Sequence, residues 1–320
     1  MKRIKLKVAY DGTAYSGWQI QPNAITIEEV LDKAIFDLTG ETIHVTGASR
    51  TDAGVHAMGN VAVFDTNSTI PGERFAYALG RFLPEDVVIQ ESREVKPDFH
   101  PRHCNTVKTY EYKILNTTFA IPQQRNYTWH VSAELDIRSM QEAARILVGE
   151  HDFKSFCCVR TQAESTVRTI YSVEVEAEAI KKAIEKRTSD AIRENGSEST
   201  SDNSQEESVG SDKKQAAQMI PIGGGEKRAA QMIPIGSGEK QAAQIVTIRI
   251  RGNGFLYNMV RIIAGTLMQV GRGQLDAEKV RWMLESKDRC MAGQTAPPQG
   301  LTLMDIDYVD GDDSVYSSVL

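Results

Sequence analysis

The stretch Gln244-Ile-Val-Thr-Ile-Arg-Ile-Arg251 alternates apolar and polar side chains, and Thr169-Ile-Tyr-Ser-Val-Glu-Val-Glu176 has the same pattern. Alternation with a period of two is typical of a β-strand that has one buried face. A polar segment without aromatic residues separates them, from about residue 180 to 240. If that insert were removed, the two strands would read as a hairpin. The sequence therefore predicts antiparallel pairing interrupted by an insertion.

The insert contains a tandem repeat. Residues 214–226 and 227–239 are two copies of a 13-residue unit, and 240–244 begin a third. This period is too short for the solenoid families, and two copies fall below the ~3 repeats that a stacked core needs. The polar composition cannot bury enough apolar surface to fold alone. We expect a disordered loop that arose by duplication, in preference to a functional module.

Helical periodicity alternates with these strand patterns. A helix is expected after Thr26, which forms a capping box with Glu29, and it should stop at Gly40. Three further helices are expected over residues 140–147, 255–270 and 277–284. Additional strands are expected over residues 2–8, 42–45 and 61–64. The combination predicts an α+β fold with helices packed on a largely antiparallel sheet and a boundary between two halves near residues 95–101.

Composition narrows the functional classes. The 320 residues carry a net charge of −6, but residues 188–212 alone contain seven acidic residues and one basic residue. The remainder can therefore form a local basic cleft. No apolar run approaches the ~20 residues of a membrane span, and the amino terminus does not resemble a signal peptide, so we expect a cytoplasmic protein. The four cysteines contain no C-x-x-C pair, and no metal site is predicted.

The loop Ser49-Arg-Thr-Asp-Ala-Gly-Val-His56 combines a carboxylate, a guanidinium, an imidazole and a glycine between two strand-like runs. Such connections present reactive groups on a rigid scaffold, and an arginine beside Asp52 could keep it ionised. An ordinary Asp-Gly-type turn is the competing interpretation. His56 could act as a general base, but its position two residues after a glycine favours a structural role.

Two other segments carry chemistry. Lys108, Tyr110 and Tyr112 share one face of a strand, which suits base stacking beside a phosphate contact, although a face packed under a helix would give the same pattern. Arg261 is the lone charge in an apolar helical run. A buried arginine is costly unless it meets an anion, and Asp52 is one candidate.

In this order, the segments resemble the TruA family of tRNA pseudouridine synthases. The resemblance covers nearly the whole chain apart from the insert; the segments that carry it are residues 10–19, 49–57, 99–102, 108–112, 149–156, 253–271 and 300–301. It implies two RRM-like (ferredoxin-like) halves that share one extended sheet, here residues 1–97 and 98–320. It also implies a homodimer that acts on the anticodon stem-loop of tRNA, at tRNA positions 38, 39 and 40, without metal or cofactor.

The resemblance further implies roles for single residues. Asp52 matches the essential aspartate, and Arg261 matches the arginine that pairs with it. Arg50 matches the arginine that helps to hold the target nucleotide out of the helix. Tyr110 would stack on the flipped uracil, and Leu301 would line the base pocket.

Two other functions remain open from the sequence. One is a non-catalytic RNA-binding or tRNA-folding protein, against which the retained Asp52 and Arg261 argue. The other is an Asp/His hydrolase, which would need a second carboxylate or a metal cluster at useful spacing. The acidity of the insert leads us to expect that its deletion leaves activity intact or improves it at low salt.

Overall fold

The computed structural model describes residues 1–158, 163–180 and 243–309. The repeat and nearly all of the insert lie outside the described residues. The described strands are β1 (Lys2–Tyr10), β2 (Thr46–Gly47), β3 (His56–Thr66), β4 (Val87–Val95), β5 (Thr106–Asn116), β6 (Trp129–Val131), β7 (Gly149–Asp152), β8 (Val167–Ala179), β9 (Gln244–Gly252) and β10 (Leu301–Tyr308). The α-helices are α1 (Ile27–Thr39), α2 (Phe75–Leu79), α3 (Ile137–Ile146), α5 (Met259–Gly271) and α6 (Ala277–Ser286).

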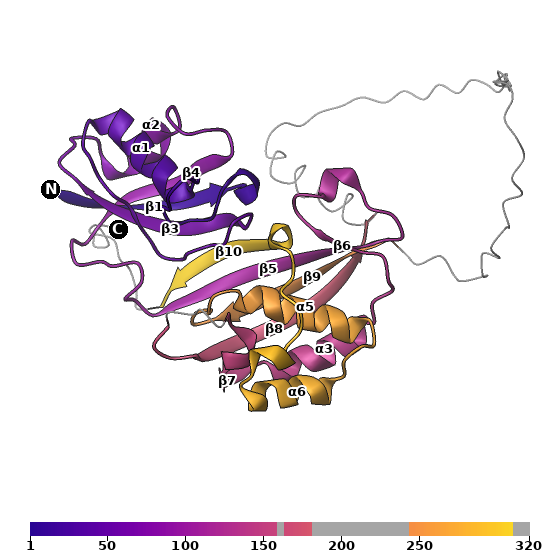
Figure 1. Ribbon diagram of the computed structural model, residues 1–320. Coiled ribbons are helices and arrows are strands. Elements are labelled where there is room, and N and C mark those ends of the chain that lie inside the picture. Colours follow the sequence, from indigo (N-terminus) through magenta and orange to yellow (C-terminus); the bar gives the residue numbers. More distant parts are fainter. Residues whose placement is uncertain (159–162, 181–242, 310–320) are drawn as a thin grey trace, which may run out of the picture. The chain divides into compact units, whose positions relative to one another are not determined.

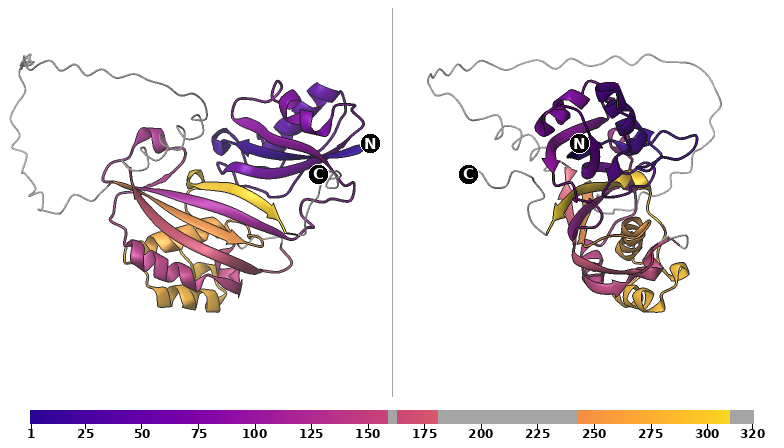
Figure 2. Two further views of the ribbon diagram at one scale, coloured as in Figure 1. Left: turned by 180° about the vertical axis from the view of Figure 1, so that it is seen from behind. Right: turned by 90° about the vertical axis from the view of Figure 1, so that its left-hand side faces the viewer.

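All ten described strands belong to one sheet, with the order β4-β1-β3-β10-β5-β9-β8-β7; β2 pairs with β3, and β6 pairs with β5. Every pairing is antiparallel except β10 with β3 and β6 with β5. Helices α1 and α2 pack beside β1, β3 and β4, while α3 and α5 cover β5, β8 and β9 and α6 lies against α3 (Figures 1 and 2). The predicted α+β class is confirmed.

The same strand order occurs twice in the sheet. Strands β1 to β4 lie in the order β4-β1-β3-β2, and β5, β8, β9 and β10 lie in the order β10-β5-β9-β8. In each set a helix follows the first and the third strand, which is the β-α-β-β-α-β pattern of a ferredoxin-like half. The two sets join where β10 pairs with β3, at Thr302 opposite His56. The division at residues 97 and 98 stays a prediction.

The hairpin expected around the insert is present. Strands β8 and β9 pair antiparallel from Ile170 opposite Gly252 to Ala179 opposite Gln244. Beyond the last pair, the Ile180 amide donates to the Ala243 carbonyl at 3.0 Å. The insert is therefore attached at the end of this hairpin that is remote from Gly252.

Helix α1 follows its capping signals closely. The Thr26 side chain accepts from the Glu29 amide at 3.4 Å, and Gly40 ends the helix with a left-handed φ of 74°. The expected helix over residues 255–270 begins instead at Met259, because Asn258 adopts a left-handed φ of 63° that a helix cannot contain.

The strand expected over residues 42–45 is wrong. Only Thr46 and Gly47 pair with β3. The Val45 amide donates to the Asp32 carboxylate of α1 at 2.8 Å. The Asp32 side chain thus accepts from a backbone amide that a strand would need for its own pairing.

The interior runs through both halves as one core, whose largest fully buried side chains include Trp18, Phe75, Tyr112 and Phe153. None of the helices in the described ranges has both the length and the apolar content needed to cross a bilayer.

Candidate active site

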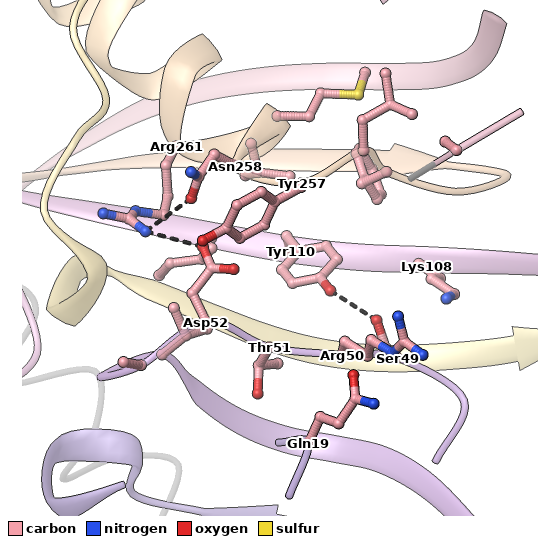
Figure 3. Close-up of a pocket in the computed structure, with 18 of the residues that line it drawn as sticks. Gln19, Ser49, Arg50, Thr51, Asp52, Lys108, Tyr110, Tyr257, Asn258 and Arg261 are labelled. Atoms are coloured by element: carbon pink, nitrogen blue, oxygen red, sulfur yellow. Dashed lines mark hydrogen bonds and ion pairs between the residues drawn. The ribbon is translucent and has the colours of Figure 1, made fainter. Parts of the chain in front are cut away.

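Asp52 lies on the connection between β2 and β3 and lines a cavity of about 900 Å³ (Figure 3). The other walls come from β5, from the segment that leads into α5, and from the start of β10. Residues from both halves therefore meet around one carboxylate.

Hydrogen bonds from β3 and from the segment between β1 and α1 hold the Asp52 loop. The Thr51 carbonyl accepts from the Trp18 amide at 3.1 Å, and the Asn60 amide side chain donates to the Ser49 carbonyl at 2.9 Å. Gly54 takes a left-handed φ of 76°, and its amide donates to the Tyr15 carbonyl. The turn chemistry seen in the sequence is thus present, and it serves to fix the position of Asp52.

Arg261 of α5 forms the expected ion pair with Asp52, with 2.9 Å between Nη1 and Oδ2. The Arg261 and Asp52 side chains are only 15% and 19% exposed. The guanidinium also donates from Nη1 to Asn258 Oδ1 at 2.9 Å and from Nε to the Ala296 carbonyl at 2.8 Å. Three acceptors therefore orient the arginine, and charge-assisted bonds of this kind are the strong ones.

Tyr110 and Tyr112 of β5 share a face but differ in role. The hydroxyl of Tyr110 lies 3.0 Å from Ser49 Oγ, its ring meets Phe255 edge-on at 5.2 Å, and it lines the cavity. Burial raises the pKa of Tyr110 to about 12. Tyr112 donates to the Pro297 carbonyl at 2.7 Å and is not among the lining residues. Only Tyr110 reaches the site, and Tyr112 belongs to the core.

Arg50 and Leu301 also line the cavity. Leu301 is buried at the start of β10, opposite Tyr112 in the register. Arg50 is exposed, and it makes no hydrogen bond or ion pair with the part of the chain that the structure describes. All five predicted site residues therefore surround one cavity.

The cavity lining carries a net positive charge, whereas the whole chain carries a net negative charge. The lining contains one acidic side chain, Asp52, and five basic ones: Arg50, Arg102, Lys108, Arg168 and Arg261. The basic cleft that the net charge of −6 concealed is present here. Within the described ranges, no group of three His, Cys, Asp or Glu side chains could hold a metal ion.

Comparison with known proteins matches this arrangement to a family. A family model described as tRNA pseudouridine synthase matches residues 7–103 and 143–309. The chain belongs to the TruA family of tRNA pseudouridine synthases. Among its relatives, each called tRNA pseudouridine synthase A, that of Thermoanaerobacter sp. (strain X514) is 40% identical over 96% of this chain and all of the relative. Those of Acetivibrio thermocellus and Brevibacillus brevis are 41% and 37% identical over the same shares.

His56 has a structural position in this TruA family member. Its Nδ1 accepts from the Gly12 amide at 3.1 Å, and its Nε2 lies 2.8 Å from the Asn126 carbonyl. Asp11 Oδ1 lies 3.1 Å from Nδ1. The imidazole is buried and does not line the cavity. Both ring nitrogens are engaged, which argues against a role as a general base.

Asn258 is the residue in this TruA site that sequence reasoning missed. It adopts the left-handed conformation directly before α5, and its side chain holds Arg261. The signal was available in principle, because asparagine is one of the few residues that tolerate a positive φ. Its place within an apparently helical run concealed it.

Proposed function

We propose that this chain converts uridine to pseudouridine in the anticodon stem-loop of tRNA, at tRNA positions 38, 39 and 40, with Asp52 as the catalytic group. Membership in the TruA family supports the reaction and the tRNA substrate. One structural observation supports the site most strongly: the Asp52–Arg261 ion pair of 2.9 Å lines a cavity that also holds Tyr110.

The reaction is an isomerisation. The N1–C1′ bond of uridine breaks, the uracil turns, and a C5–C1′ bond forms. The C5 hydrogen leaves as a proton and N1 takes up a proton, so substrate and product are isomers. Asp52 can act as the nucleophile at C1′, or it can remove the C2′ proton to give a glycal. Both routes need an ionised carboxylate, which the Arg261 guanidinium favours. No electrons are gained or lost, and we propose that the protein works without metal or cofactor.

The target base must first leave the stack, which costs a few kcal/mol. We assign Tyr110 to stacking on the flipped uracil and Arg50 to holding the nucleotide out of the helix. The exposed, unengaged guanidinium of Arg50 suits this role better than that of Arg261, which three acceptors already hold. Leu301 would contact the base from β10.

The test is tritium release from tRNA labelled at C5 of uridine. We expect release by the wild-type protein and none by Asp52→Asn. Asp37→Asn is the matched control, because Asp37 lies on α1 and, among the described residues, pairs with Lys33 alone. Binding of tRNA without any release by the wild type would support the non-catalytic RNA-binding protein instead.

We also propose a homodimer in the cytoplasm, on the strength of the family resemblance. Light scattering coupled to size-exclusion chromatography of the full chain measures the mass directly. A monomeric mass at micromolar concentration would contradict the dimer and would leave the catalytic proposal untouched.

A further inference from the structure

Three cavity cations have no role in the chemistry proposed above. They are Arg102, which lies between β4 and β5, Lys108 of β5 and Arg168 of β8. Figure 3 shows Tyr110 between Arg261 and Lys108, so that Lys108 marks the side of the cavity away from the Asp52–Arg261 pair. The cavity therefore has a reaction end and a cationic end.

Among the described residues, the hydrogen bonds of these three side chains go to uncharged backbone oxygens. Lys108 Nζ donates to the Ala48 carbonyl at 3.1 Å, and Arg102 Nε donates to the Gly47 carbonyl at 2.7 Å. Arg168 Nη1 donates to the Ser165 and Val167 carbonyls. Across residues 1–158, 163–180 and 243–309, none of the three lies in an ion pair with a carboxylate.

Lys113 provides an instructive contrast on the same strand. It lies on the opposite face of β5 and pairs with Glu111 at 3.5 Å. Arg249 pairs with both Glu111 and Glu174, so two carboxylates compensate the two cations on that face. Among the described residues of β5, the cation without a carboxylate partner is thus the one on the cavity face.

This uncompensated arrangement has an energetic cost. Burial, followed by repulsion from Arg102 and Arg168, lowers the pKa of Lys108 to about 8. Burial also lowers the pKa of Arg102 and of Arg168. Desolvated cations that repel one another are unfavourable unless an anion joins them. A bound anion would offset both the desolvation of these cations and the repulsion between them.

We propose that Lys108, Arg102 and Arg168 form a subsite for one backbone phosphate of the RNA beside the flipped uridine. The proposal rests on the proposed function, which places the uracil on Tyr110. Two residues along a strand span about 7 Å, and both side chains point to the same face. A base on Tyr110 and a phosphate at Lys108 would therefore be joined by the ribose between them.

The proposed subsite couples RNA binding to the protonation of Lys108. Near pH 8 a fraction of Lys108 is neutral, and a bound phosphate would restore its charge by uptake of a proton. Among the described residues, the charges that lower the pKa of Lys108 are those of Arg102 and Arg168, and arginines do not titrate in this range. Affinity for RNA should therefore fall above pH 8 through Lys108 itself.

The experiment measures tRNA affinity of the full chain against salt and pH, in an Asp52→Asn background that prevents turnover. Lys108→Met is compared with Lys108→Arg and with the control Lys113→Met. We expect Lys108→Met to weaken binding at pH 7 and to reduce the salt slope by about 0.7 to 0.9, the value for one phosphate contact. The control should keep the slope.

The pH dependence of tRNA affinity distinguishes a phosphate contact of Lys108 from a structural effect of its substitution. With a free pKa of about 8, the charged fraction of Lys108 falls about tenfold between pH 7 and pH 9. Lys108→Arg stays charged, so its affinity should exceed that of the lysine protein at pH 9 by up to that factor. Equal pH profiles for lysine and arginine, or an unchanged salt slope in Lys108→Met, would overturn the subsite.

A stem-loop RNA with single methylphosphonate linkages locates the phosphate. At one linkage beside the target uridine, neutralising the phosphate and substituting Lys108→Met should give non-additive losses. Additive losses at every linkage would contradict the proposal. These readouts are binding measurements, so absent tritium release would overturn the proposed function without affecting them.

Discussion

The guanidinium of Arg261 connects the Asp52 carboxylate to the start of α5. Its Nη1 is shared between Asp52 and Asn258, and its Nε is held by Ala296. The position of the ion pair therefore depends on a residue that carries no charge.

Asn258→Gly tests that dependence. Glycine accepts the positive φ of 63° without strain but removes the bond to Arg261. Because hydrogen bonds to charged groups contribute about 1.5–3 kcal/mol, we expect a single-turnover rate reduced by roughly 10- to 100-fold. Asn23→Gly is the control, because Asn23 also has a positive φ, of 61°, but does not line the cavity. Equal rates in the two variants would refute the positioning role.

Lys108 should lower the stability of the RNA-free protein. Its pKa of about 8 lies below the ordinary lysine pKa of 10.5, which applies to the unfolded chain. At pH 7 the charge is present in both states and disfavours the folded one. Between pH 8 and 10.5 the folded state loses the proton first, so stability rises with pH. We expect Lys108→Met to stabilise the protein by about 1–3 kcal/mol at pH 7 and by little at pH 10.5, measured by urea unfolding.

At the scale of elements, the contact between α5 and the chain before β10 fixes the arginine. The Ala296 amide donates to the Arg261 carbonyl at 3.0 Å, while the Ala296 carbonyl accepts from Arg261 Nε. Gly265, one turn further along α5, permits this approach, because a Cβ there would lie 1.9 Å from the Gln294 carbonyl oxygen.

Gly265→Ala should therefore affect both stability and catalysis. The added methyl must displace the segment that carries Ala296, at a cost of about 1–3 kcal/mol, and activity should fall because Arg261 loses a fixed acceptor. Gly80→Ala is the matched control, since the nearest atom to its Cβ would be 3.6 Å away. Denaturant unfolding and tritium release measure the two effects. A variant that unfolds and turns over like the control would contradict this account.

At the scale of the whole molecule, the insert is attached far from the cavity along one strand. Arg168 lines the cavity near the start of β8, and the insert follows the end of β8 at Ala179. Eleven residues of strand separate them by about 36 Å. The insert is therefore attached at the end of β8 that lies away from the cavity.

Deletion of residues 188–212 isolates the effect of charge. It removes a net charge of −6 and leaves the described hairpin intact. We expect unchanged turnover at saturating tRNA and faster association at low salt, because less negative charge repels the phosphates. Stopped-flow association at 50 mM and 200 mM salt provides the measurement. A large loss of turnover would show that the acidic stretch takes part in function.

Local sequence patterns predicted the helices and strands correctly where contacts between residues close in the chain decide the structure. The capping box at Thr26, the stop at Gly40 and the alternation in β8 and β9 all predicted their elements. Local patterns failed over residues 42–45, where Asp32 of α1 takes the Val45 amide, and at Asn258, whose backbone ends the apparent helix. In both places a bond or a turn outside the pattern overrode the propensity.

The sequence by itself predicted a largely antiparallel sheet, and it provided the family resemblance and the identity of the charged residues. It also indicated that Arg261 needs an anion, because a lone charge among apolar neighbours is costly. Only the tertiary structure decided that Asp52 is that anion. It also decided that Tyr110 lines the cavity while Tyr112 packs in the core. Among the described residues, Lys108 lacks a carboxylate partner, which the sequence did not reveal. The reason is physical: electrostatic and packing energies depend on distances between groups that may lie 209 residues apart in the chain.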